Sequence, residues 1–225
     1  MNDDEFADLA IVTDIRFASD GTTLTVLYGR PDRGLAYPTA GERITPDLGY
    51  RIVSRRFGTD VPARGGIQAA GDVNGDGADD ILVAGFGLIL GSAEPLPPNV
   101  VTLDDLREPR ARRIDGVGVR VRPVGDVNDD GRADLLIAPP SGPDDFPTGR
   151  DAYVLLDAFA TADSLAGGNL TEQPGFPLPL QTFSTPGINA LGDVDGDGVD
   201  DLAAPNVRLD TGSRGVIVYG SREFQ

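Results

Sequence analysis

The chain has 225 residues, a formal net charge of -17 and 40% hydrophobic residues, enough apolar content for a packed core. It contains no Cys and no His, and all 19 basic residues are Arg. Disulfides, thiolate or imidazole metal sites, a Ser-His-Asp triad and lysine-dependent catalysis are therefore excluded. The negative charge disfavours nucleic acid as a partner. No apolar run approaches the roughly 20 residues of a membrane-spanning helix, so no membrane insertion is expected.

The chain opens on a shortened copy of an acidic motif that recurs further on. Asn2, Asp4 and Asp8 fall at the third, fifth and ninth places of this motif, and the apolar run 9–12 follows them. The place of the first aspartate would precede Met1. We therefore predict an incomplete metal loop at this end, followed by a β-strand.

Three complete copies of the motif follow, and each leads directly into an apolar segment. They read GDVNGDGADD at 71–80, GDVNDDGRAD at 125–134 and GDVDGDGVDD at 192–201. With the first Asp as place 1, side-chain oxygens recur at places 1, 3, 5 and 9. Place 6 is Gly in every copy (Gly77, Gly131 and Gly198), where we expect a sharp turn with positive φ.

These loops have the ligand chemistry of calcium, which takes roughly six to eight oxygens. Each offers four side-chain ligands and a backbone carbonyl at place 7. The predicted metal ligands are Asp72, Asn74, Asp76, Ala78 and Asp80; Asp126, Asn128, Asp130, Arg132 and Asp134; and Asp193, Asp195, Asp197, Val199 and Asp201. An all-oxygen set disfavours transition metals, and magnesium tends to keep its waters. We predict about three Ca²⁺ sites, with Asp79, Asp129 and Asp200 at solvated, non-ligand places.

Two other interpretations of the loops were weighed. An EF-hand needs a bidentate Glu at place 12, but this place holds Val83, Ile137 and Ala204. The EF-hand therefore fails in all three copies. The loops could also be metal-free Asp-Gly turns, but three copies with the same ligand places favour calcium.

Short apolar runs on either side of the loops predict further strands. Those before the loops span 66–70, 117–124 and 187–191, and those after the following strand span 24–29, 88–91, 153–157 and 216–220. Segment 157–165 has the best helical pattern and allows a turn or two. The variable stretches 31–63, 95–113, 141–150 and 163–186 are each expected to hold an outer edge strand, where Pro is tolerated.

The motif, with its following apolar run and a VIVYG-like strand at 216–220, resembles the FG-GAP repeat of integrin α-subunit β-propellers and of bacterial extracellular proteins. The segments LIAP at 136–139 and AAP at 203–205 echo a second family signature. The resemblance implies an all-β fold, a partial β-propeller of about four blades with the first and last incomplete. Its blades would be four-stranded and antiparallel, with the structural calcium loop between the first and second strands.

This resemblance treats 1–225 as a single propeller domain or fragment, with repeats at about 1–65, 66–116, 117–186 and 187–225. A fragment of a longer propeller, a small closed ring and an assembly of copies all remain open. The missing start of the first repeat favours the fragment.

The functional expectation is a non-catalytic calcium-binding module for adhesion or ligand binding. Two Arg groups could contact a protein or anionic glycan ligand: Arg51, Arg55, Arg56 and Arg64, and Arg107, Arg110, Arg112 and Arg113. Alternatively, they balance neighbouring acids. There are two alternatives to this function. The chain could be an accessory or catalytic part of a secreted glycan- or lipid-acting enzyme, or it could be a structural spacer. Weak calcium loops suit the millimolar calcium outside cells, so we expect an extracellular or cell-surface location, although no signal peptide precedes the acidic start.

Overall fold

A computed structural model of the chain is all-β apart from one short helix, α1 (Ala158–Thr161). The expected all-β class is confirmed. The structure describes residues 2, 6–13, 22–30, 44–54, 67–83, 86–94, 101–102, 106, 110–114, 120–138, 152–161, 173–178, 188–209 and 212–224. The chain divides into two compact units, one of Met1–Ile67 with Asp76–Arg112 and one of Gln68–Gly75 with Arg113–Gln225.

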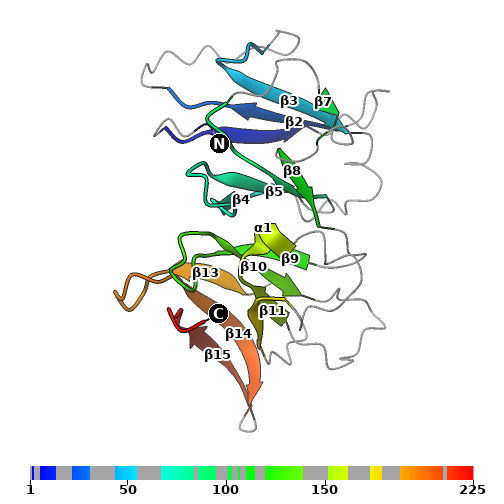
Figure 1. Ribbon diagram of the computed structural model, residues 1–225. Helices are drawn as coiled ribbons and strands as arrows, with labels where there is room; N and C mark the ends of the chain where they lie inside the picture. Colours follow the sequence, from blue (N-terminus) through cyan, green and yellow to red (C-terminus); the bar gives the residue numbers. More distant parts are fainter. Residues whose placement is uncertain are drawn as a thin grey trace. The chain divides into compact units, whose positions relative to one another are not determined.

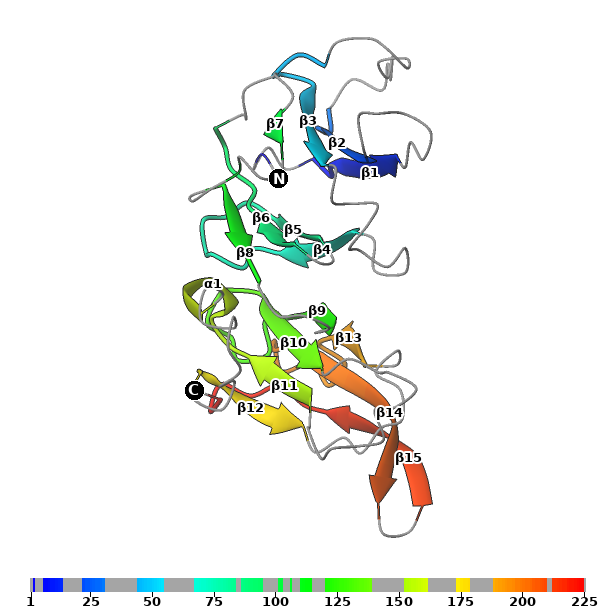
Figure 2. The same ribbon diagram turned by 90° about the vertical axis from the view of Figure 1, so that its right-hand side faces the viewer.

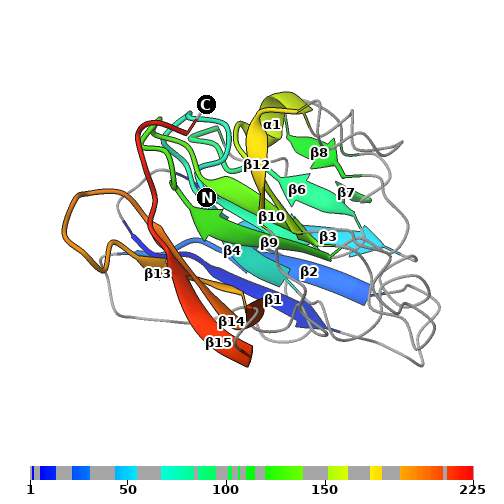
Figure 3. The ribbon, with the colours of Figure 1, turned by 90° about the horizontal axis from the view of Figure 1, so that it is seen from below.

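The first sheet has the order β1-β2-β3-β7. Its strands are β1 (Leu9–Thr13), β2 (Thr22–Leu27), β3 (Gly49–Ser54) and β7 (Val101–Thr102). Figure 3 shows β1, β2 and β3 side by side. The first three strands pair in antiparallel fashion, but β7 pairs parallel to β3. This differs from the expected purely antiparallel blade, because a segment far along the chain pairs with the outer edge of β3.

The second sheet has the order β4-β5-β6-β8. Its strands are β4 (Ile67–Gly71), β5 (Asp80–Val83), β6 (Gly87–Ile89) and β8 (Ala111–Arg113). All four residues of β5 are buried. This explains why Ile81–Val83, which follow Asp80, form a continuous apolar run rather than an alternating pattern, since a strand covered on both faces needs apolar residues on both.

The third sheet has the order β12-β11-β10-β9, and Figure 2 shows β10, β11 and β12 in this succession. Its strands are β9 (Arg120–Gly125), β10 (Asp134–Ala138), β11 (Ala152–Leu155) and β12 (Gly175–Leu178). Pro177 lies in β12, at the sheet edge where the missing N–H breaks no ladder bond. This confirms an outer edge strand within 163–186.

The fourth sheet has three strands in the order β13-β14-β15, in keeping with the expected incomplete last repeat. They are β13 (Asn189–Gly192), β14 (Asp201–Leu209) and β15 (Gly212–Val218). The long antiparallel hairpin of β14 and β15 is visible in Figure 1. In both the third and fourth sheets the register shifts where the acidic loop joins its strands, between Asp134 and Leu135 and between Ala190 and Gly192.

Each unit has its own hydrophobic core. In the first unit, side chains of β2 and β3, such as Leu24 and Ile52, pack against Ile81 and Val83 of β5. In the second unit, Leu136 of β10 and Val154 of β11 pack against the fourth sheet, including Leu202. Consecutive sheets therefore bury apolar faces against one another within each unit.

The acidic loops have the same topological position wherever they are complete. They connect β4 to β5, β9 to β10 and β13 to β14, the first and second strands of their sheets. The predicted variable stretch 141–150 lies outside the described residues, as do 31–43 of the stretch 31–63 and 163–172 of the stretch 163–186. The helical turn expected within 157–165 is present as α1.

Candidate metal centre

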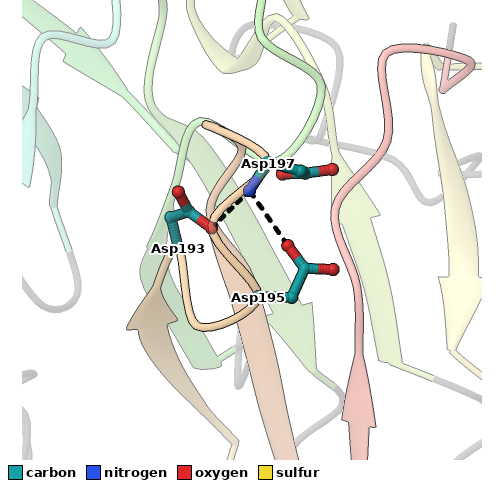
Figure 4. A group of neighbouring side chains, drawn as sticks. All are labelled: Asp193, Asp195 and Asp197. Atoms are coloured by element: carbon teal, nitrogen blue, oxygen red, sulfur yellow. Dashed lines mark hydrogen bonds between the residues drawn. The ribbon is translucent and has the colours of Figure 1, made fainter.

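The third complete loop brings three of its predicted ligands together. One oxygen from each of Asp193, Asp195 and Asp197 lies within 4.8 Å of the other two, and all three residues are exposed. Figure 4 shows the three carboxylates around the loop, with the Asp197 N–H donating to both Asp193 and Asp195. Within the described part of the chain this is the one such group of acidic side chains.

The carboxylate at place 1 organises each loop by accepting backbone N–H groups. Asp72 Oδ1 accepts from Gly75 at 2.7 Å, and Asp126 accepts from Asp130 and Gly131. Asp193 accepts from Gly196, Asp197 and Gly198. Hydrogen bonds from these amides, that of Gly198 above all, lower the pKa of Asp193, so its anionic form is favoured for a cation.

The carboxylate at place 5 closes the second half of each loop. Its Oδ1 accepts the N–H at place 7 in all three copies, at 2.9 Å each: Asp76 from Ala78, Asp130 from Arg132 and Asp197 from Val199. The three loops thus repeat one local geometry. Backbone hydrogen bonds alone therefore hold these side chains in place around the loop.

Glycine conformations match the sequence expectation at place 6. Gly77, Gly131 and Gly198 have φ values of 92°, 84° and 90°, the left-handed region that glycine adopts without steric cost. Place 4 is also left-handed, with φ of 58° at Asp129, where the other copies have Gly. We did not predict this second turn, although the Gly at place 4 of two copies is its signal.

The second loop contains two buried oxygens that lack hydrogen-bond donors. They are Oδ1 of Asn128 at place 3 and Oδ1 of Asp134 at place 9. A buried oxygen without a partner is destabilising, typically by about 1–3 kcal/mol. Both atoms belong to residues predicted as metal ligands, so the donor set fits an oxygen-seeking cation.

The aspartate at place 9 has a structural role that sequence reasoning missed. Asp80, Asp134 and Asp201 are the buried charged residues among those described, each at most 1% exposed. Oδ2 of Asp134 and of Asp201 accepts the place 2 N–H of its own loop, at 2.9 Å in both cases. The side chain at place 9, at the end of the loop, is therefore hydrogen-bonded to the backbone at the start of the loop.

The other oxygen at place 9 reaches the turn after the next strand. Oδ1 accepts a glycine N–H in three repeats: Asp8 from Gly29, Asp80 from Gly91 and Asp201 from Gly220. In the second complete loop Asp157 replaces this glycine. The Asp157 N–H lowers the pKa of Asp134, whereas Oδ1 of Asp134 has no hydrogen-bond partner. Each carboxylate oxygen has two lone pairs, so the aspartate at place 9 can accept these hydrogen bonds and still bind a metal ion. Its role as a metal ligand stays a prediction.

Neighbouring loops are joined by a repeated backbone hydrogen bond. The place 1 carbonyl of one loop accepts the place 8 N–H of the next: Asp72 from Ala133 at 2.7 Å, and Asp126 from Asp200 at 3.0 Å. Oδ2 of Asp200 also accepts the Asp126 N–H at 3.0 Å. The loops of the second unit thus form a continuous stack.

Two of the three aspartates expected to be solvated contribute to such contacts. Asp200 binds the preceding loop, and Asp129 forms an ion pair with Arg222. The solvated assignment was wrong for Asp200, which is half-buried, because the motif alone does not reveal which loops are adjacent. Asp129 is exposed, as expected, and its ion partner Arg222 is exposed too. Asp79 is exposed, as expected.

The remaining predicted site residues are described only in part. Asp4 of the shortened first loop lies outside the described residues, whereas Asn2 and Asp8 are half-buried. Of the two Arg groups, Arg55, Arg56, Arg64 and Arg107 also lie outside. Arg110 Nη2 donates to the Glu94 carbonyl at 2.6 Å and lies 3.8 Å from its carboxylate. This is the charge balancing that we weighed against ligand binding.

Comparison of the sequence with models of known protein families finds no matching family, and a search of curated proteins finds no significant relative. No helix in the described part of the chain is long and apolar enough to cross a membrane. The functional interpretation therefore depends on the geometry of the loops.

Burial raises the pKa of Asp134 from its ordinary value of 3.8 to about 7. The Val127 N–H lowers this pKa, and the charges of Asp130 and Asp126 raise it. Because the folded state holds the proton more tightly, the contribution of Asp134 to stability is present below pH 3.8. It is lost as the pH rises through about 7.

We predict that calcium-free protein loses more stability between about pH 4 and 7 than its Asp134→Asn variant, by at most about 4 kcal/mol. Urea unfolding in EDTA across this pH range measures the difference. Asp79→Asn, at an exposed position of the first loop, is the matched control and should follow the wild type. If the stability of Asp134→Asn and of the wild type changed equally with pH, the raised pKa of Asp134 would be contradicted.

Proposed function

We propose that the chain forms blades of a calcium-stiffened β-propeller and acts as a non-catalytic binding module at the cell surface or outside the cell. The observation that carries the calcium part is the pair of buried, unpartnered oxygens in the second loop, Asn128 Oδ1 and Asp134 Oδ1. The acidic group in the third loop supports it. Calcium would bring positive charge to these oxygens and bind them as ligands, and it would have no catalytic role.

The propeller arrangement is supported by how consecutive sheets meet in the second unit. The third and fourth sheets bury apolar faces together, and their first strands, β9 and β13, lie in contact. Residues of β4 from Gln68 onward, of β9 and of β13 line one hollow of about 510 Å³. First strands gathered around a common space are what a propeller requires of its inner strands.

A structural role for the ion follows from the stack of loops. Each loop is hydrogen-bonded to the next through its place 1 carbonyl, so stiffening one loop restrains its neighbour. The acidic side chains within one loop repel one another, and a bound cation removes this repulsion. Exposed loops of this kind suit the millimolar calcium outside cells.

Calcium should raise the melting temperature of the chain, and EDTA should lower it again. At a free calcium concentration about 100 times Kd, one site contributes about 2.7 kcal/mol, which corresponds to a shift of several degrees. Asp195→Asn removes one charge from the exposed group of the third loop and should reduce the calcium-induced shift. Asp79→Asn removes one charge at a non-ligand place and should leave the shift unchanged.

Differential scanning calorimetry with calcium, magnesium or EDTA makes this comparison. Magnesium should give a smaller shift because it retains its waters. A melting temperature of the wild type that does not respond to EDTA would refute the calcium sites.

The binding function is tested by applying the calcium-loaded chain to glycan and protein arrays. A binding module should give specific signals that disappear in EDTA, because the loops stiffen the presenting surface. No calcium-dependent signal on either array would favour the spacer interpretation instead.

A further inference from the structure

The sheets at the two ends of the chain expose large apolar side chains. On β1, Leu9 and Ile11 are 43% and 41% exposed; we call these the N-terminal face. On and beside β13 and β15, four residues form what we call the C-terminal face: Leu191, Val194, Ile217 and Tyr219, which are 41–53% exposed. These two faces contain most of the large exposed hydrophobic residues in the described part of the chain.

The internal repeat explains what the C-terminal face is for. Aligning the loops of the third and fourth sheets places Leu191 and Val194 on Val124 and Val127. The strand registers that follow place Ile217 and Tyr219 on Val154 and Leu156. Those four counterparts are at most 2% exposed, and they form part of the core that the fourth sheet covers. The C-terminal face therefore has the composition of a surface on which another sheet of this type packs.

The N-terminal face corresponds to the other half of the internal interface between the third and fourth sheets. Leu9 and Ile11 align with Leu202 and Ala204 of β14. Both counterparts are 1% exposed, and both pack in the core shared with the third sheet. The N-terminal face therefore corresponds to the side of the fourth sheet that covers its predecessor.

Backbone groups repeat the same correspondence. Between the third and fourth sheets, the carbonyls of Asp126 and Val127 accept the N–H groups of Asp200 and Ser221. The aligned carbonyls at the C-terminal face are those of Asp193 and Val194, both exposed residues. The aligned N–H groups at the N-terminal face are those of Ala7 and Arg30, which are also exposed residues.

The glycine turn has a similar close backbone approach at both positions. A Cβ on Gly220 would meet Asp200 O at 2.4 Å and Val127 O, across the interface, at 3.0 Å. A Cβ on the aligned Gly29 would meet Ala7 O at 2.5 Å. The turn at the N-terminal face is thus already formed in the conformation that the internal interface uses.

We propose that the N-terminal face of one molecule docks on the C-terminal face of a second copy of this chain, head to tail. The contact reproduces the interface between the third and fourth sheets. Acceptors lie on one face and donors on the other, so each face complements the other rather than itself. The interface is therefore heterologous, not a two-fold contact between identical faces.

The proposal goes beyond the calcium module and is tested with calcium present throughout. Sedimentation velocity of the full chain, from micromolar to hundreds of micromolar, should show assembly that grows with concentration. Moderate salt is needed, because each chain carries a net charge of -17 and like charges repel.

Two substitutions then test the head-to-tail geometry. Ile217→Glu on the C-terminal face and Ile11→Glu on the N-terminal face should each raise Kd at least about tenfold and give monomers. Mixing these two variants should restore a 1:1 dimer, because each retains the face that the other has lost. The matched control is Val12→Glu: Val12 is 39% exposed and lies opposite Leu24, on the other face of β1. It should assemble like the wild type.

Three results would overturn the proposal. The wild type could remain monomeric at every concentration. It could be monomeric with a melting temperature lowered by Ile217→Glu, which would indicate that one chain closes on itself. Either single variant could still self-associate as the wild type does. The calcium response of the same samples is read separately, so failure of docking and failure of the calcium sites are distinguishable.

Discussion

The structure depends on how each acidic loop holds several carboxylates in one short turn. Like charges at about 4 Å repel one another by about 1 kcal/mol per pair even in water. The backbone counters this with N–H groups aimed at places 1 and 5 and with the buried aspartate at place 9, as at Asp201. That aspartate links the loop, the strand that follows it and the turn beyond. The loop is therefore part of the sheet rather than an appendage.

The same loops transmit order along the chain. Because the carbonyl of Asp126 accepts the Asp200 N–H, the third and fourth sheets are joined at their loop edge as well as through their core. Arg222 adds an ion pair to Asp129 at this edge. A cation bound in one loop would thus act on a polar stack that continues into the next.

Much of this was predictable because the motif specifies local geometry. The apolar runs after each loop predicted β5, β10 and β14, and the Gly at place 6 predicted its left-handed turn. The contacts of Asp200 were not predictable, because they depend on which loops are adjacent in space. The parallel pairing of β7 was missed for the same reason. The hydrogen bond from the Gly220 N–H to Asp201 at place 9 was not predictable either, because sequence spacing does not reveal that these two residues are close in space.

The central claim is that the loops are metal sites and not merely hydrogen-bonded turns. Calcium stoichiometry tests it most directly, measured by equilibrium dialysis of the full chain against millimolar calcium. One ion should bind for each of the three complete loops, at 71–80, 125–134 and 192–201. A chain that retains no calcium under these conditions would contradict it.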